Sequence, residues 1–359
     1  MQALIDDMFT RELSADGRAA RNYRALASVR RKVFDLQGLR LELRFNPDRV
    51  KSVMAEVDEL SLSQRPCFLC PDGLEQHQLT TLWTAPAPSN EEADHQVHAH
   101  TYAFRVNPYP IFDRHLTISA LEHTRQQIDG RLTDMLCIAR LINRYTLFYN
   151  GPHCGASAPD HMHFQAIPRH QLPIEQTTDW DEIAPGISVH RFFESGAVRL
   201  RSTSPTLLVS TITRLLSRAT TPAHEWEPRI NLLCFCDMPE HLSSMQEPNT
   251  LEQEPHSSEQ EPLNTSVQEP NTLEQEHLSS EQEPLYTAIL FFRRESRPHQ
   301  FFLPESERIL FSPATVEMAG IGIVADERSF ERIDQDLLTG MLAEVSLPRH
   351  DLEQLVLFP

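Results

Sequence analysis

The chain has 359 residues, 40% of them hydrophobic and 23% charged, so it is long and apolar enough to bury a core. Its 32 basic and 51 acidic residues give a formal net charge of -19, which repels phosphate backbones and argues against a nucleic-acid-binding protein. No apolar run approaches the roughly 20 residues that span a bilayer, and the acidic N-terminal segment is unlike a signal peptide. We therefore expect a cytoplasmic protein with no membrane partner.

The sequence pattern predicts a mixture of helices and strands. Strands are numerous and close together, which favours antiparallel sheets with packed helices, an α+β fold, over a doubly wound parallel sheet. The expected elements, in chain order, are two short amphipathic helices within residues 2–28, a β-hairpin at 33–45, a helix following the apolar residues from Leu132 to Tyr145, a strand at 146–151 and a strand at 161–168.

An acidic repeat interrupts the C-terminal half. QEPNTLEQEPHSSEQEPLN, from Gln246, returns almost unchanged from Gln268, and residues 240–283 hold eleven glutamates and no Lys or Arg. Such a segment cannot bury enough apolar surface to fold, so we expect a disordered insert at 238–285. The apolar runs on either side, 229–236 and 286–294, are typical of β-strands, and we expect them to pair as a hairpin whose turn is the insert.

The segment HMHFQ carries the strongest signal of chemistry. Side chains alternate along a strand, so His161, His163 and Gln165 share one face. A neutral imidazole is a competent nucleophile toward phosphorus, which makes covalent catalysis one reading of this face. The polar face of an exposed strand is the other. The loop before the strand contains Gly155 and Ser157, and small residues allow backbone amides to approach phosphate oxygens closely.

Cys67 and Cys70 have the CxxC spacing of a metal site. Two ligands do not complete a site, and a pair of ordinary buried thiols is the alternative.

The motifs RPCFLC, NPYPIFDRHLTI and GASAPDHMHFQ together resemble the transferase branch of the histidine-triad superfamily, which has H-x-H-x-Q where the hydrolase branch has a third histidine. That branch includes galactose-1-phosphate uridylyltransferases, diadenosine tetraphosphate phosphorylases and GDP-hexose phosphorylases. The similarity is strongest to an uncharacterised bacterial family within it. The resemblance implies two histidine-triad-like lobes, a catalytic lobe at 46–175 and a divergent lobe at 176–359, after an N-terminal segment of helices and hairpin at 1–45.

The resemblance also implies roles for individual residues. His163 is the implied nucleophile and Gln165 the ligand of the phosphate oxygens, with contributions from His161 and Ser157. Zinc is the implied cofactor, bound by Cys67, Cys70, His115 and His161. The expected substrate-binding residues are Asn107, Asn231, Arg293 and Arg297; the two arginines follow the second strand of the interrupted hairpin and suit a distal phosphate.

The resulting expectation is a nucleotidyltransferase of the phosphorylase type that forms a nucleotidyl-histidine at His163. The donor is a nucleotide sugar or a dinucleoside polyphosphate, the acceptor is phosphate or a sugar phosphate, and the chain is expected to form a homodimer. Two alternatives stay open: a nucleotide hydrolase of the same superfamily, and a zinc-stabilised nucleotide-binding adaptor without catalysis.

Overall fold

The computed structural model describes residues 1–36, 39–47, 65–70, 78–86, 99–190, 196–239 and 283–357. Met1–Asp237 and Leu285–Pro359 together form one compact unit; Met238–Pro284 is a second unit and lies almost wholly outside these ranges. The expected disorder of the insert falls on that second unit and is therefore outside the described residues. Within the ranges above, no helix is long and apolar enough to cross a membrane.

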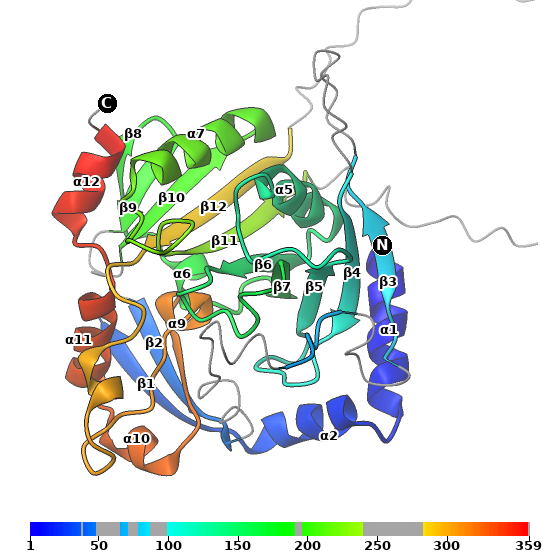
Figure 1. The fold of residues 1–359 in the computed structure, drawn as a ribbon, viewed down its shortest axis with the longest axis horizontal. Coiled ribbons are helices and arrows are strands. Elements are labelled where there is room, and N and C mark those ends of the chain that lie inside the picture. The colour runs from blue at the N-terminus through cyan, green and yellow to red at the C-terminus, as the bar shows by residue number, and fades with distance from the viewer. Residues whose placement is uncertain are drawn as a thin grey trace, which may run out of the picture. The chain divides into compact units, whose positions relative to one another are not determined.

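Helices flank the sheets throughout the larger unit (Figure 1). Their bounds are α1 Gln2–Ser14, α2 Arg18–Ala25, η1 Leu26–Ser28, α5 Leu132–Leu141, α6 Pro173–Gln176, α7 Pro205–Arg218, η5 His299–Phe302, α9 Thr315–Met318, α10 Glu327–Arg332, α11 Gln335–Val345 and α12 Arg349–Leu357.

The strands form two sheets, one of three strands in the order β1-β2-β13 and one of ten. Their bounds are β1 Arg30–Leu36, β2 Leu39–Phe45, β3 Thr81–Thr84, β4 Thr101–Val106, β5 Leu116–Ala120, β6 Tyr145–Asn150, β7 His163–Pro168, β8 Trp180–Ala184, β9 Ile187–His190, β10 Ala197–Ser202, β11 Ile230–Asp237, β12 Leu285–Phe292 and β13 Ile321–Val324.

The ten-stranded sheet is antiparallel, with the order β3-β4-β5-β7-β6-β11-β12-β10-β9-β8. Its two halves repeat one topology: β3 to β7 and β8 to β12 each run in the same relative order, and each places a helix, α5 or α7, before its fourth strand. The halves join where β6 pairs with β11. The mixed α+β fold is thus confirmed, and the repeated topology supports the division into two lobes, which stays a prediction.

Both expected hairpins are present. β1 pairs with β2 in antiparallel register, ending at Leu36 opposite Leu39. β11 pairs with β12 from Ile230 opposite Phe292 to Asp237 opposite Leu285, so the residues on either side of the insert are direct neighbours. In chain order the acidic repeat therefore connects two paired strands, as the loop 151–162 connects β6 to β7 in the first half.

The helix expected between Leu132 and Tyr145 is shorter than the apolar spacing suggested. α5 ends at Leu141, and Tyr145 instead begins β6, where it pairs with Pro168. Tyr145 is buried in β6, and an apolar residue at this spacing also suits the buried face of a helix, so the pattern could not distinguish the end of the helix from the start of the strand.

The central strands are buried on both faces, which requires a layer on each side. α5 packs against β11 and α7 against β10 (Figure 1). α7 begins at Pro205 because the Ser204 hydroxyl caps the backbone N–H of Leu207. On the face that carries the His163 side chain, a continuous apolar core joins the large sheet to the small sheet, with Phe148, Leu233, Ile289, Leu41, Leu43 and Ile323 among its members.

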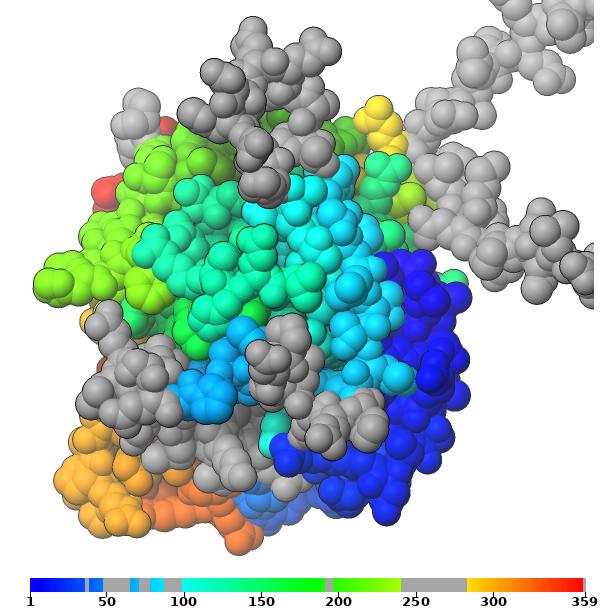
Figure 2. Space-filling model, turned by 45° about the vertical axis from the view of Figure 1, so that its right-hand side comes forward, coloured from blue at the N-terminus to red at the C-terminus, as the bar shows by residue number. Residues whose placement is uncertain are grey.

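The two helices expected within residues 2–28 are α1 and α2. α1 buries Ile5, Met8 and Phe9, and it packs against β4, as the dark blue N-terminal residues beside the cyan strands show in Figure 2. α1 therefore lies against the sheet at β4, and α2 packs against α1.

Candidate active site

His163 begins β7 near the centre of the large sheet, and its side chain is only 4% exposed. The side chain of Gln126, itself fully buried, holds the backbone at this point: Gln126 Oε1 accepts the His163 N–H at 2.8 Å, and Gln126 Nε2 donates to the His163 carbonyl at 3.0 Å. Gln126 Nε2 also donates to the Asn150 carbonyl at 2.9 Å. One amide side chain thus replaces the pairing with β6, which begins only at Gln165, whereas on the other side of β7 His163 lies opposite Ser119 of β5.

The imidazole of His163 has a defined tautomer. Its Nδ1 lies 2.8 Å from the carbonyl oxygen of His161, and a carbonyl can only accept, so Nδ1 carries the proton and Nε2 keeps its lone pair. Burial lowers the pKa of His163 to about 4, which keeps the ring neutral near pH 7. A buried neutral imidazole with an unprotonated Nε2 is the form that can attack phosphorus.

Gln165 lies two residues further along β7, on the same face as His163, as the alternation predicted. Its Oε1 lies 2.8 Å from Nε2 of His115, a buried histidine that precedes β5. With Nε2–H of His115 as donor, the amide oxygen of Gln165 is occupied and the amide nitrogen stays available as a donor. His115 therefore orients Gln165.

Four potential metal ligands meet beside His163. Cys67, Cys70, His123 and His161 each offer one atom, and these atoms all lie within 4.8 Å of one another. His115, expected as a ligand, is not part of this cluster, because its Nε2 faces Gln165, and the fourth potential ligand is His123, just past the end of β5. The other three ligands are those predicted.

The cluster fits zinc in donor type, and its ligand atoms lie close to the spacing of a tetrahedral site. Sγ of Cys67 lies 3.3 Å from Nδ1 of His161, and Sγ of Cys70 lies 3.1 Å from Nδ1 of His123. Tetrahedral ligands at zinc bond lengths of ~2.0 to 2.3 Å lie ~3.3 to 3.8 Å apart. Nε2–H of His161 donates to the Ala120 carbonyl at 2.8 Å, which leaves its Nδ1 lone pair toward the thiols, as in metal sites with an ordered second layer of contacts. These residues could bind a metal such as zinc.

The loop 151–162 leads from β6 to β7 and contains small residues. Gly155 has φ +92°, and a Cβ there would collide with Ala314, so this position requires glycine. Ser157, half-buried in the same loop, accepts a hydrogen bond at its carbonyl from Arg65 at 3.3 Å, and Arg65 also pairs with Asp160 at 3.2 Å. Arg65 thereby connects the loop to the cysteine segment that follows it.

Asn231 and Arg293, predicted to bind substrate, have structural roles instead. Arg293 is buried, and all five of its N–H donors are used on the Asn231 side chain and four backbone carbonyls. Asn231 Nδ2 donates to the Cys154 carbonyl at 2.7 Å and to Asn150 Oδ1 at 3.3 Å. The pair therefore supports the loop 151–162 from beneath. Because the N–H groups of the buried Arg293 are all bonded within the protein, none is left for the phosphate contact that the sequence pattern predicted.

Asn107 and Arg297 differ in how much donor capacity they keep. Asn107 closes a turn, with its Oδ1 accepting the Tyr109 N–H at 2.8 Å and its Nδ2 donating to Thr117 Oγ1 at 3.0 Å. Arg297 is half-buried beside the Phe301 ring and donates through Nε to Ser312 at 3.0 Å. Within the described residues Arg297 has no carboxylate partner, and its contact with a phosphate stays a prediction.

Sequence reasoning missed Arg105, a buried cation on β4. Its Nη1 donates to Ser119 Oγ at 2.7 Å, and Ser119 lies directly opposite His163 across β5 and β7. Burial lowers the pKa of Arg105, which the neighbouring Cys70 partly offsets. In the described part of the chain it has no carboxylate partner. Only its two-residue spacing from Asn107 could have indicated this position.

The fold and the site together define a mixed α+β protein with a buried histidine beside a Cys/His cluster. A family model described as "Domain of unknown function (DUF4922)" matches residues 8–168, which includes the histidine pair and all four clustered residues. No curated protein matches the chain significantly.

Three solved structures of yeast Ap4A phosphorylase Apa2 are similar to the chain, each at 14% identity over 92% of it. The structure without a stated ligand is covered over 94% with a TM-score of 0.48, the AMP complex over 95% with 0.47, and the Ap4A complex over 96% with 0.45.

Proposed function

We propose that this protein is a nucleotidyltransferase of the phosphorylase type, which transfers a nucleoside monophosphate through a covalent intermediate on Nε2 of His163. The observation that carries the proposal is the hydrogen bond from His163 Nδ1 to the His161 carbonyl, made by a buried ring whose pKa is lowered to about 4. This combination keeps Nε2 unprotonated and aimed away from its own backbone partner, as a nucleophilic imidazole requires.

The reaction consists of two displacements at the α-phosphorus. In the first, the Nε2 lone pair forms an N–P bond and the bond from phosphorus to the leaving phosphate oxygen breaks. In the second, an oxygen of inorganic phosphate or of a sugar phosphate attacks the same phosphorus and the N–P bond breaks. His163 is regenerated in its neutral form, and no proton has to leave Nδ1 because its carbonyl partner stabilises it in both steps.

Donors around His163 suit the charge that develops on phosphorus oxygens. The amide nitrogen of Gln165, oriented by His115, is one donor, and the loop with Gly155 and Ser157 supplies backbone amides and a hydroxyl. Arg297 is the expected contact for a more distant phosphate. We expect the donor substrate to be a dinucleoside polyphosphate or a nucleotide sugar, and Asn107 to lie near its sugar.

Zinc, when bound by Cys67, Cys70, His123 and His161, would provide a rigid tetrahedral cross-link rather than a reacting group. The chain's own contribution is the His161 backbone, whose carbonyl fixes the tautomer of His163. The His161 ring would be held by the metal on one side and is held by its hydrogen bond to the Ala120 carbonyl on the other. Fixing the ring keeps the backbone carbonyl of His161 in place.

The test is product analysis with a panel of dinucleoside tetraphosphates and nucleoside-diphosphate sugars, with and without inorganic phosphate. A phosphorylase gives a nucleoside diphosphate only when phosphate is present, whereas a hydrolase gives the monophosphate without it. His163→Ala should abolish product formation. His350 is an exposed histidine on α12, and the matched variant His350→Ala should form product at the rate of the unmodified chain. Nucleoside monophosphate formed at an unchanged rate without phosphate would overturn the phosphorylase assignment.

A further inference from the structure

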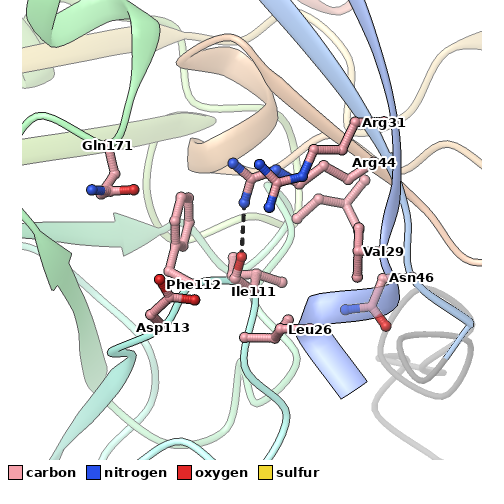
Figure 3. A pocket seen from close by; sticks show the side chains of 10 residues that line it. Leu26, Val29, Arg31, Arg44, Asn46, Ile111, Phe112, Asp113 and Gln171 are labelled. Carbon is pink, nitrogen blue, oxygen red and sulfur yellow. Dashed lines mark hydrogen bonds between the residues drawn. The ribbon is translucent and has the colours of Figure 1, made fainter. Parts of the chain in front are cut away.

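A cavity of about 120 Å³ lies between the small sheet and the segment that joins β4 to β5 (Figure 3). Neither His163, Gln165 nor any residue of the Cys/His cluster lines it. Its polar lining residues are Arg31, Arg44, Asn46, Asp113 and Gln171, and Phe112 provides an aromatic wall. The cavity is therefore separate from the candidate active site.

Two arginines on one side of the cavity share a single carboxylate. Nε of Arg31 lies 3.3 Å from Oε1 of Glu42, and Arg44 binds the same carboxylate through Nε at 3.0 Å and Nη2 at 3.2 Å. Figure 3 shows the two guanidinium groups side by side at the cavity wall. Among the described residues, Glu42 is the one carboxylate that contacts these two cations, so this side of the cavity carries a net positive charge. Guanidinium groups present a planar fork that matches phosphate and carboxylate oxygens.

Arg44 is held in place by the protein's own contacts before any ligand binds. Arg44 is buried, its Nη1 donates to the Ile111 carbonyl at 2.9 Å, and its guanidinium lies 4.9 Å from the centre of the Phe112 ring. The bond to the Ile111 carbonyl and the two bonds to Glu42 use three of the five N–H donors of Arg44. Two donors therefore remain for a ligand. Because the guanidinium is already ordered, binding an anion there costs little side-chain entropy.

The far side of the cavity has different chemistry. Asp113 and Gln171 lie there, beyond the Phe112 ring as seen from the arginines (Figure 3). Asp113 forms no ion pair within the described residues, so its carboxylate can accept hydrogen bonds from hydroxyl groups and repels a second anionic group. The two sides together favour a ligand with one anionic end and a hydroxyl-bearing end.

We propose that this cavity binds a small phosphate monoester of a polyol, with the phosphate against Arg31 and Arg44 and the hydroxyl groups toward Asp113 and Gln171. The site is independent of the reaction at His163.

Isothermal titration calorimetry of the full chain with glycerol 3-phosphate, inorganic phosphate and glycerol tests the proposal. We expect saturable binding of glycerol 3-phosphate, weaker binding of inorganic phosphate, and none of glycerol. Arg31→Gln should weaken binding of glycerol 3-phosphate about tenfold or more, the loss of one charged contact. Arg31 is half exposed and holds no backbone group, so the variant should fold.

Two control variants distinguish binding in this cavity from non-specific effects of charge and from the proposed reaction at His163. Arg40→Gln changes an exposed arginine on β2 that does not line the cavity and should bind like the unmodified chain. His163→Ala should also bind glycerol 3-phosphate normally, so failure of the proposed enzymatic function leaves this result unaffected. Equal binding by Arg31→Gln and the unmodified chain, or no binding of glycerol 3-phosphate, would overturn the site; inorganic phosphate binding as tightly as the ester would overturn the role of Asp113 and Gln171.

Discussion

The carbonyl oxygen of His161 accepts the Nδ1–H of His163 at 2.8 Å, while the ring of the same His161 lies among two cysteines and His123. One residue therefore touches both parts of the site, with its side chain in the candidate metal cluster and its backbone setting the tautomer of the nucleophile. A change in the cluster reaches His163 through a single residue.

The composition of the metal cluster can be tested directly. His123→Ala should lose bound zinc, because it removes one of four ligands, whereas His115→Ala should keep it, because His115 faces Gln165. The measurement is metal content by mass spectrometry on chain purified with added zinc. Zinc retained by His123→Ala and lost by His115→Ala would restore the ligand set that the family resemblance implied.

Gln126 is expected to be important for stability as well as for the site. Gln126→Ala leaves the N–H and carbonyl of His163 and the carbonyl of Asn150 without their partner, and buried unsatisfied groups cost ~1 to 3 kcal/mol each. We expect a loss of at least ~3 kcal/mol in denaturant unfolding. The control variant at the next residue, Gln127→Ala, removes one exposed hydrogen bond with Arg125 and should lower the unfolding free energy by less than ~1 kcal/mol. Equal losses in the two variants would contradict this role.

The buried carboxyl of Glu227 should make stability depend on pH. Burial raises its pKa to about 7, against hydrogen bonds from the Tyr149 hydroxyl at 2.6 Å and the Ile128 N–H at 2.9 Å. A folded-state pKa above the unfolded value means that the folded state binds the proton more tightly. The contribution of this group to stability is therefore full below about pH 4.5 and is lost as pH rises through about 7.

Glu227→Gln removes this titration and is the means of measuring it. The difference in unfolding free energy between the two proteins should change by up to ~3 kcal/mol between pH 4.5 and 7, with the unmodified chain losing stability relative to the variant as pH rises. The difference, rather than the single curve, is required because the lowered pKa of the buried His163 gives a contribution of opposite sign. A constant difference in unfolding free energy across this pH range would show that the pKa of Glu227 is not raised.

The reassignment of Arg293 from substrate contact to structural support also has a test. Arg293→Lys keeps the charge but cannot reach the five acceptors that the guanidinium satisfies, so we expect a loss of ~3 kcal/mol or more in unfolding free energy. A substrate-binding arginine would behave differently, with KM raised and the unfolding transition unchanged. That second pattern would reinstate the role inferred from the sequence.

The sequence identified the features that depend on local pattern. Alternation placed His163 and Gln165 on one face, and apolar runs located the strands on either side of the acidic insert. His123 was missed because it reaches the cluster only through the pairing of β5 with β7, which sequence spacing does not record. Arg293 was misassigned because residues at strand ends are commonly exposed, whereas here the C-terminal end of α11 packs beside it and buries it.

Intact-protein mass spectrometry after incubation with a nucleotide donor in the absence of acceptor shows whether His163 forms a covalent nucleotidyl intermediate. We expect a mass increase of one nucleoside monophosphate, labile in acid as a phosphorus–nitrogen bond is, located by peptide mapping on His163 and absent from His163→Ala. His350→Ala should still carry it. The same adduct on His163→Ala, or mapped to another residue, would contradict the account.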